Sequence, residues 1–254
     1  MALDNLRAFI GAIDARGELA RVERPVSVDK EITEIADRCM KSAGGGPALL
    51  FAHPTLRAGG ASRYPVAVNL FGSERRMALA LGVECLDQIG DRIAELLNLK
   101  VPDSLMGKLA LLPRLAEVAK FPPKTVSRPP CQETVIKAAD VDLSRFPVPI
   151  CWPEDGGPYI TLPGVITRAP VSGVRNVGMY RVQVLGKNEL AMHWQRHKVG
   201  AAHWRAMAER GETMPVAIAL GGDPASIYAA PAPLPPTIDE YLFAGFLRGE
   251  PVRL

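Results

Sequence analysis

Cysteine is scarce in this sequence, and no cysteine falls into a metal-binding or disulfide pattern. The four cysteines are scattered through 254 residues without C-x-x-C spacing: Cys39, Cys85, Cys131 and Cys151. That distribution argues against a structural zinc site and against a disulfide framework. We expect the thiols to be reduced and mostly buried, because free cysteine usually behaves as a small core hydrophobe.

Long apolar runs and an excess of one charge are also missing. No apolar run approaches the roughly 18 to 20 residues that cross a bilayer. The first residues, MALDNLRAFIGAID, lack the basic and then apolar segments of a secretion signal. The 30 basic and 27 acidic residues are spread along the chain, which argues against a nucleic-acid-binding stripe. We expect a cytoplasmic protein without a transmembrane segment.

Most familiar catalytic motifs are absent as well. The sequence contains no G-x-x-x-x-G-K-[ST], G-x-S-x-G or H-E-x-x-H pattern, and no convincing G-x-G-x-x-G that opens a helix. The glycines at 44–46 have no strand before them and no helix after them that could cradle a phosphate, so we interpret them as a loop. Familiar catalytic motifs therefore do not assign a function to this sequence.

What the sequence does contain is a change of pattern near its middle. Up to residue 120, helical periodicity alternates with short apolar strands, which predicts an N-terminal α/β domain. The expected strands are ELARVER, ALLF and PVAVNLF. The expected helices lie between Asp4 and Gly17, from Asp29 to the glycines at 44–46, and at Ser73 to Leu81, Leu86 to Leu97 and Leu105 to Ala119.

A proline-rich stretch, FPPKTVSRPPC, predicts a linker at residues 121–131 and a second domain over 132–254. There YITLPGVITR, NVGMYRVQVLG and LAMHW predict adjacent antiparallel strands. A helix near 200–210, a strand PVAIALG and a helix over Ile238 to Leu247 follow. Residues 251–254 begin another strand for which the sequence offers no partner, so we expect a truncated chain.

Polar residues cluster in this second domain, and each has an ordinary structural interpretation. His193 and His197 are four residues apart, but a strand rather than a helix is expected there, which disfavours a two-histidine zinc site. Glu240 completes a capping box with Thr237. Asn176 fits a turn residue, and Arg181 fits a solvated charge on a strand. Residue types alone therefore support an anion-binding pocket and no particular reaction.

Four stretches are similar to the UbiD family of decarboxylases: CWPEDGGPYIT, RNVGMYRVQVLGKNELAMHWQRH, PVAIALGGDPASIYAA and IDEYLFAGFLRGEPV. The chain most resembles the branch that decarboxylates 4-hydroxy-3-polyprenylbenzoate in ubiquinone synthesis. The resemblance implies reversible, non-oxidative decarboxylation of an aromatic or α,β-unsaturated carboxylic acid. It implies a second domain of the flavin-binding split-barrel type, with the family's C-terminal domain absent.

The resemblance also implies cofactors and partners. The family uses prenylated FMN, supplied by a flavin prenyltransferase and held through its phosphate by Mn²⁺ or Mg²⁺, with K⁺ nearby in some members. The substrate is a small carboxylic acid, and a homo-oligomer is expected. A polyprenylated substrate would place the protein at the periphery of a membrane.

Matched position by position, the resemblance implies a metal site at Asn176, His197 and Glu240. The amide oxygen, the carboxylate and the flavin phosphate oxygens form the hard-donor set that Mn²⁺ or Mg²⁺ prefers. Arg181 would be the catalytic residue, because its planar guanidinium can hold a substrate carboxylate. Lys198 would lie near the phosphate. The residues that would line the flavin are Met179, Tyr180, Arg181, His193, Trp194, Gln195, His197 and Lys198.

The sequence departs from the branch at His193 and at Lys198-Val199, where an arginine and an arginine-glycine pair are expected. The family's catalytic acid lies in a later segment resembling E-G-x-x-G-[DE], which this sequence does not contain, and no other acid replaces it convincingly. Strand alternation would put Asn176 and Arg181 on opposite faces, so we expect a bulge at Gly178.

Two other functions remain open from the sequence. The chain fits a flavin-binding subunit whose catalytic acid comes from another polypeptide. It also fits an FMN oxidoreductase of the reductase type, because split barrels bind ordinary FMN. NAD(P)H-dependent flavin reduction would distinguish the oxidoreductase from the decarboxylase.

Overall fold

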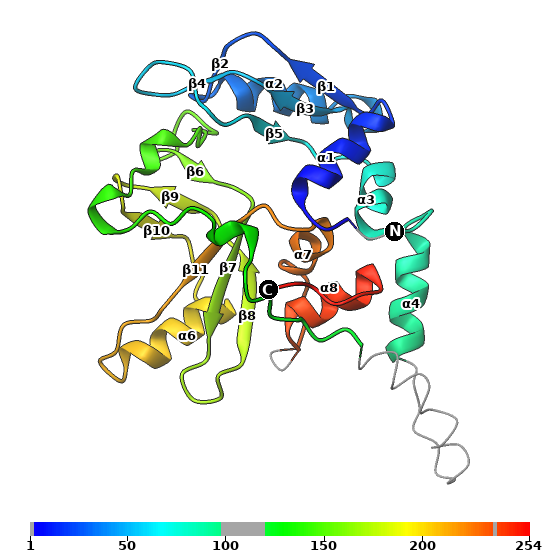
Figure 1. The fold of residues 1–254 in the computed structure, drawn as a ribbon, viewed down its shortest axis with the longest axis vertical. Helices are drawn as coiled ribbons and strands as arrows, with labels where there is room; N and C mark the ends of the chain where they lie inside the picture. The colour runs from blue at the N-terminus through cyan, green and yellow to red at the C-terminus, as the bar shows by residue number, and fades with distance from the viewer. Residues whose placement is uncertain (1–2, 98–119, 236–237) are drawn as a thin grey trace.

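The computed structural model describes residues 3–97, 120–235 and 238–254. The helix expected at Leu105 to Ala119 and the capping residue Thr237 lie outside the described residues. The expected mixed α/β fold is confirmed, with an α/β unit followed by a β-rich unit (Figure 1). Among the helices of the described part of the chain, none is long and apolar enough to cross a membrane.

The N-terminal unit is a small mixed sheet with helices packed around it. The sheet has the order β1-β3-β5, in which β1 and β3 are parallel and β3 and β5 antiparallel. A second parallel pair joins β2 and β4. The elements are α1 (Leu6–Ala15), β1 (Leu19–Val22), β2 (Val26–Ser27), α2 (Glu31–Met40), η1 (Ala43–Gly45), β3 (Ala48–Phe51), β4 (Pro54–Thr55), β5 (Val66–Val68), α3 (Glu74–Leu81) and α4 (Asp87–Leu97).

Side-chain alternation along β3 gives this sheet a core on each face. Ala48 packs with Phe9 and Ile13 of α1, whereas Phe51 packs in a cluster that contains Ile32 of α2. Successive strand residues point to opposite faces, so the two helices cover opposite sides. The strands and helices expected from apolar spacing within residues 3–97 are confirmed.

The second unit contains two three-stranded antiparallel sheets, β10-β9-β6 and β11-β7-β8. Its elements are η2 (Pro130–Gln132), η3 (Ala138–Asp140), η4 (Leu143–Arg145), β6 (Tyr159–Ile160), β7 (Pro163–Arg168), β8 (Arg175–Met179), β9 (Val182–Val184), β10 (Leu190–Met192), α6 (Val199–Ala208), β11 (Ala217–Leu220), α7 (Pro224–Ala229) and α8 (Glu240–Arg248). In Figure 1, α6 lies beside β7 and β8, near the end of their sheet away from the N-terminal unit.

Each of the two long strands expected in this unit is divided between the two sheets. The stretch YITLPGVITR forms β6 and then β7, and NVGMYRVQVLG forms β8 and then β9. Pairing with β7 is regular along all five residues of β8, so the bulge expected at Gly178 is wrong. The chain leaves this sheet after Met179 instead. Tyr180 and Arg181 lie between two strands, and alternation from Asn176 does not extend to Arg181.

The last residues of the chain do have a pairing partner. Arg253 pairs in parallel with Lys124, and the Leu254 N–H donates to the Lys124 carbonyl oxygen at 2.8 Å. The expectation of an unpartnered terminal strand is therefore wrong. Phe121 also packs edge-on against Phe246 of α8 at a centroid distance of 5.9 Å. The segment interpreted as a linker thus packs on the second unit, and the exact domain boundary stays a prediction.

A shared hydrophobic cluster joins the two units. Leu81 of α3 and Ile89 of α4 pack with Ala225 of α7 and Leu247 of α8, and all four are buried. The two units therefore meet through a desolvated core and not only through polar surfaces.

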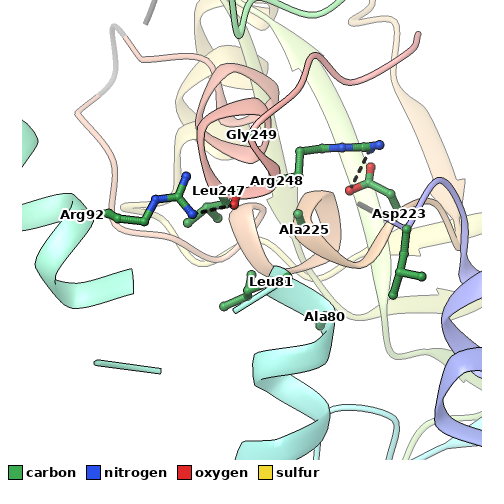
Figure 2. A pocket seen from close by; sticks show the side chains of 10 residues that line it. Ala80, Leu81, Arg92, Asp223, Ala225, Leu247, Arg248 and Gly249 are labelled. Carbon is green, nitrogen blue, oxygen red and sulfur yellow. Dashed lines mark hydrogen bonds and ion pairs between the residues drawn. The ribbon is translucent and has the colours of Figure 1, made fainter. Parts of the chain in front are cut away.

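A small cavity of about 80 Å³ lies at this junction (Figure 2). Arg92 donates to the carbonyl oxygens of Phe246 and Leu247 at 2.6 and 3.2 Å. Arg248 pairs with Asp223 at 3.4 Å, and these side chains are 7% and 4% exposed. The charged groups here are partnered within the fold, so the cavity is part of the junction and not a candidate active site.

All four cysteines are free thiols, as expected. The expectation that they are mostly buried is wrong, because Cys85 and Cys131 are exposed, and Cys39 and Cys151 are only partly covered.

Candidate functional site

Asn176 lies in β8 on the side of the sheet that faces α6. It pairs with Thr167 of β7, so the two side chains share a face, and Thr167 in turn contacts His203 of α6. Asn176 is 6% exposed, and its Nδ2 has no hydrogen-bond partner among the described residues. An unpaired buried amide costs free energy, so this position calls for a functional explanation.

Glu240 is the first residue of α8, and its carboxylate reaches the edge of β8. Its Oε2 accepts a hydrogen bond from the Val177 N–H at 2.8 Å. The capping box expected with Thr237 is wrong, because Asp239 is the N-cap and accepts from the Tyr241 N–H at 2.8 Å. Burial raises the pKa of the Glu240 carboxyl, although the Val177 hydrogen bond works in the opposite direction.

The start of α8 is fixed to β8 by an ion pair that sequence reasoning missed. Arg175 donates to the Asp239 carboxylate, and its guanidinium lies 4.9 Å from the centre of the Tyr241 ring. Val177, on the same face as Arg175, packs in a core cluster with Tyr241 and Ala244 of α8. These contacts hold the Glu240 carboxylate next to the backbone that follows Asn176.

An aromatic pair covers the α6 face of β8 beyond Asn176. The Tyr180 ring lies over Gly178, where a Cβ would come within 2.3 Å of its hydroxyl oxygen. Trp194 meets Tyr180 edge-on at a centroid distance of 6.2 Å, and its buried Nε1 has no partner among the described residues. A Cβ at Gly200 would lie 2.9 Å from that nitrogen. Both glycines therefore leave room for aromatic rings.

Met179 lies on the opposite face of β8. It packs against the core cluster of Val177 and Tyr241, so its side chain points toward α8 and not toward Tyr180. Only its backbone borders the face that carries Asn176.

Arg181 follows the end of β8 and is held by the loop at 151–158. Its Nη2 donates to the Asp155 Oδ2 at 2.8 Å, and its guanidinium stacks 3.9 Å from the centre of the Tyr159 ring. The hydrogen bond that Arg181 donates to Asp155 raises the pKa of Arg181 above its ordinary value. Burial works to raise the pKa of Asp155, but the Arg181 and Trp152 hydrogen bonds outweigh it, and the net pKa is lowered. An acid does contact Arg181, which sequence reasoning did not anticipate.

The segment at 193–198 leads into α6 and is mostly exposed. His193, Gln195, His197 and Lys198 are exposed, and the Lys198 N–H donates to the Gln195 carbonyl oxygen at 3.0 Å. Lys198 is the N-cap of α6 but makes no side-chain capping bond, and the first turn carries no acidic residue. The helix N-terminus is therefore free to receive an anion.

The predicted site residues fall into two groups in space. The Glu240 carboxylate binds the Val177 N–H, next to Asn176 in the chain, and Tyr180 and Trp194 pack together. In the described part of the chain, no hydrogen bond or ion pair joins His197 or Arg181 to Asn176 or Glu240. The assignment of His197 to a metal and of Arg181 to the same pocket stays a prediction.

Sequence reasoning missed His203, whose Nδ1 lies 3.0 Å from the Thr167 Oγ1. Burial lowers the pKa of His203 below its ordinary value. The two residues are 36 positions apart, and no local pattern connects them. The only signal was that His203 belongs to the group of three histidines at 193–203.

Two protein-family models match this chain. Residues 124–254 match the family model of the 3-octaprenyl-4-hydroxybenzoate carboxy-lyase Rift-related domain, and residues 10–96 match that of the N-terminal domain of the same carboxy-lyase. The chain belongs to the UbiD family. The two matched UbiD regions correspond to the α/β unit and the β-rich unit of the fold.

Individual relatives extend the match over the whole chain. An uncharacterised protein from Aquifex aeolicus is 47% identical over 98% of this chain, and one from Archaeoglobus fulgidus is 46% identical over 100% of it. Among solved structures, the UbiD-class enzyme HmfF from Pelotomaculum thermopropionicum, in complex with FMN, has a TM-score of 0.80 and 26% identity over 98% of this chain. The vanillic acid decarboxylase of Sedimentibacter hydroxybenzoicus, in its closed form, has a TM-score of 0.80 and 25% identity.

The chain spans about half the length of these relatives. It covers 50% of both uncharacterised proteins, 50% of the HmfF chain and 49% of the vanillic acid decarboxylase chain. The matches establish the family and the fold, and the activity of the longer proteins is not thereby assigned to this chain.

Proposed function

We propose that this chain is the cofactor-binding half of a UbiD-class carboxy-lyase. The proposed reaction is the reversible, non-oxidative decarboxylation of an aromatic or α,β-unsaturated carboxylic acid with prenylated FMN and Mn²⁺ or Mg²⁺. The polyprenylated hydroxybenzoate is one substrate of this class. The observation that carries the proposal is the approach of the Glu240 carboxylate to the edge of β8 immediately beside the buried Asn176.

The donors at that edge fit a hard divalent cation. The Asn176 amide oxygen and the Glu240 carboxylate are oxygen ligands, which Mn²⁺ and Mg²⁺ prefer over sulfur. Burial disfavours an ionised Glu240, and a bound cation would reverse that preference. The Asn176 Nδ2 has no hydrogen-bond partner among the described residues, so a molecule bound at this site would have to supply an acceptor for it.

The surroundings also fit a flavin phosphate and ring. The N-terminus of α6 is uncapped and follows Lys198, which suits a phosphate, and Tyr180 and Trp194 offer aromatic surface beside it. When bound, the prenylated flavin would supply the electron sink for decarboxylation. The remaining work of binding and orienting falls to residues of this chain.

Arg181 is the proposed substrate-binding residue. Its side chain is 38% exposed and donates one nitrogen to Asp155, so the rest of the guanidinium fork remains available for a carboxylate. Stacking on Tyr159 fixes the plane of that fork. The pKa of Asp155 is lowered, so its side chain is an ionised carboxylate when it binds Arg181. Asp155 is therefore a poor proton donor near neutral pH.

A second candidate function is a flavin-binding subunit that works with a separate second-half polypeptide. The observation that favours it is the half-length match to every relative described above. Mixing the purified chain with the second half of the Aquifex aeolicus relative tests it. Decarboxylation by the mixture and not by either part would support the subunit, as would co-elution of the two. Full turnover by this chain alone would contradict it.

Metal and flavin binding test the main proposal. We expect the chain to bind Mn²⁺ in the presence of FMN. We expect Glu240→Gln and Asn176→Ala to weaken that binding at least about tenfold, because the first replaces an anionic carboxylate by a neutral amide and the second removes the amide oxygen. Glu209→Gln, an exposed change at the end of α6, is the matched control and should bind as the native chain does. Electron paramagnetic resonance of free Mn²⁺ measures the affinity. Equal affinity in Glu240→Gln and native protein would contradict the proposed site.

A further inference from the structure

We infer that Gln183 is a positioning residue for the Arg181 guanidinium, because its side chain is hydrogen-bonded to both of the structures that hold that guanidinium. This inference rests on the proposed function, in which Arg181 binds the substrate carboxylate. Gln183 lies in β9. It acts on Arg181 through Tyr159 and through the loop that carries Asp155.

The first support of Arg181 is the Tyr159 ring, whose centre lies 3.9 Å from the guanidinium carbon. Tyr159 of β6 is directly opposite Gln183 of β9, so the two side chains share a face of the sheet. The Tyr159 hydroxyl donates to the Gln183 Oε1 at 3.1 Å. This hydrogen bond anchors the far end of the ring, and with it the surface on which the guanidinium stacks.

The second support is the Asp155 carboxylate. Its Oδ2 accepts from the Arg181 Nη2 at 2.8 Å and from the Trp152 N–H at 3.1 Å. The next residue, Gly156, accepts at its carbonyl oxygen from the Gln183 Nε2 at 2.7 Å. A Cβ at Gly156 would lie 3.0 Å from that nitrogen, so the absence of a side chain lets the loop lie close to Gln183. The amide therefore fixes the backbone beside the carboxylate.

Gln183 thus uses its donor and its acceptor on two different supports of the same cation. Only an amide side chain offers a strong donor and a strong acceptor at one end without a charge. An arginine side chain has many rotamers, and ordering it when a ligand binds costs free energy. Here the guanidinium is held by a ring and by a carboxylate before any ligand arrives, which favours binding.

Nuclear magnetic resonance of the full chain without ligand tests the positioning directly. Protons over the face of an aromatic ring resonate upfield, so we expect upfield side-chain signals from Arg181, identified by their loss in Arg181→Lys. Gln183→Met keeps the length of the side chain but removes both hydrogen bonds, and it should move these signals toward those of exposed arginines. Gln132→Met, at an exposed position in η2, is the matched control and should leave them unchanged.

Calorimetric titration with 4-hydroxybenzoate, in the presence of FMN and Mn²⁺, measures what the positioning contributes to binding a carboxylate. We expect Gln183→Met to weaken binding about 2- to 10-fold, the range of a lost hydrogen bond. Tyr159→Phe, which keeps the ring and removes only the hydroxyl, should weaken it by no more than that. In an Arg181→Lys background, Gln183→Met should cause no further loss, because both residues act on one path.

Unchanged Arg181 signals in Gln183→Met would overturn the inference, and so would native affinity for the probe. An equal loss from Gln183→Met in the native and Arg181→Lys backgrounds would overturn it as well, because it would show a general packing role. If Gln183→Met fails to fold, Tyr159→Phe decides by the same signals. If the signals move but the native chain binds no 4-hydroxybenzoate, the proposed role of Arg181 falls, whereas the positioning of its side chain stands.

Discussion

Replacing Gly178 by alanine tests the packing of the aromatic pair over β8. A Cβ at this position would lie 2.3 Å from the Tyr180 hydroxyl oxygen and 2.4 Å from its Cε2 and Cζ atoms. These distances are far shorter than van der Waals contact, so the Tyr180 ring must swing away. Gly178 does not have a positive φ, so backbone strain contributes nothing and the effect is steric.

The expected change in unfolding free energy has two destabilising contributions and one stabilising contribution. Overpacking of a closely fitted site costs about 1 to 3 kcal/mol. Loss of the edge-on contact with Trp194 costs about 0.5 to 1.5 kcal/mol more. The smaller backbone entropy of alanine in the unfolded chain returns about 0.4 to 1 kcal/mol. We therefore expect Gly178→Ala to lower the free energy of unfolding by about 0.5 to 4 kcal/mol.

Gly164→Ala is the matched control. Gly164 pairs with Met179 in the same two strands, but a Cβ there would meet its neighbours at 3.7 to 3.9 Å, which is ordinary contact. The same chemical change should therefore stabilise the chain by about 0.4 to 1 kcal/mol. Urea unfolding followed by tryptophan fluorescence measures both. Equal stability of the two variants would refute the packing described for Tyr180 and Trp194.

Three further predictions concern the junction and His203. Leu247→Ala leaves a cavity at a position that is 1% exposed and should lower the free energy of unfolding by about 2 to 5 kcal/mol. The control Leu185→Ala, at a position that is 59% exposed, should change it by no more than about 0.5 kcal/mol. Similar urea midpoints for the two variants would contradict the shared core. Arg248→Met removes the cation paired with the buried Asp223, which keeps its hydrogen bonds from the Ser226 N–H and hydroxyl, and should cost about 1 to 3 kcal/mol, which calorimetry at neutral pH checks. Burial lowers the pKa of His203 below 6.5, so its contribution to stability is complete above that pH and is lost as the pH falls through the lowered value. Unfolding in an acidic pH series should show a smaller decline for His203→Gln, and an unchanged decline would contradict the assignment.

Much of the N-terminal unit could be predicted because its apolar spacing is local. Phe9 and Ile13 fall at helical spacing and both are buried, and β3 follows from the apolar run ALLF. The second unit was harder to predict because its strands change sheets. The run from Arg175 to Val184 is strand-like at both ends, and nothing in its alternation marks the crossing at Tyr180 and Arg181.

The candidate site shows a similar division. The resemblance to the UbiD family indicated Asn176 and Glu240 as metal ligands, whereas the local sequence pattern alone placed Glu240 in a capping box. Asp239 takes the cap instead, since aspartate is itself a strong N-cap residue, and the Glu240 carboxylate is then free to reach β8. The pair of Arg181 with Asp155, 26 positions apart, arises only when β6 and β9 come together, so spacing in the sequence could not predict it.

The central claim is that this chain belongs with prenylated-flavin carboxy-lyases in function as well as in fold. Its most direct test is the absorption spectrum and intact mass of the cofactor that the chain retains after coexpression with a flavin prenyltransferase. We predict a bound flavin heavier than FMN, together with a divalent metal that is lost in Glu240→Gln. A chain that retains no flavin, or that binds only ordinary FMN reducible by NAD(P)H, would contradict the claim.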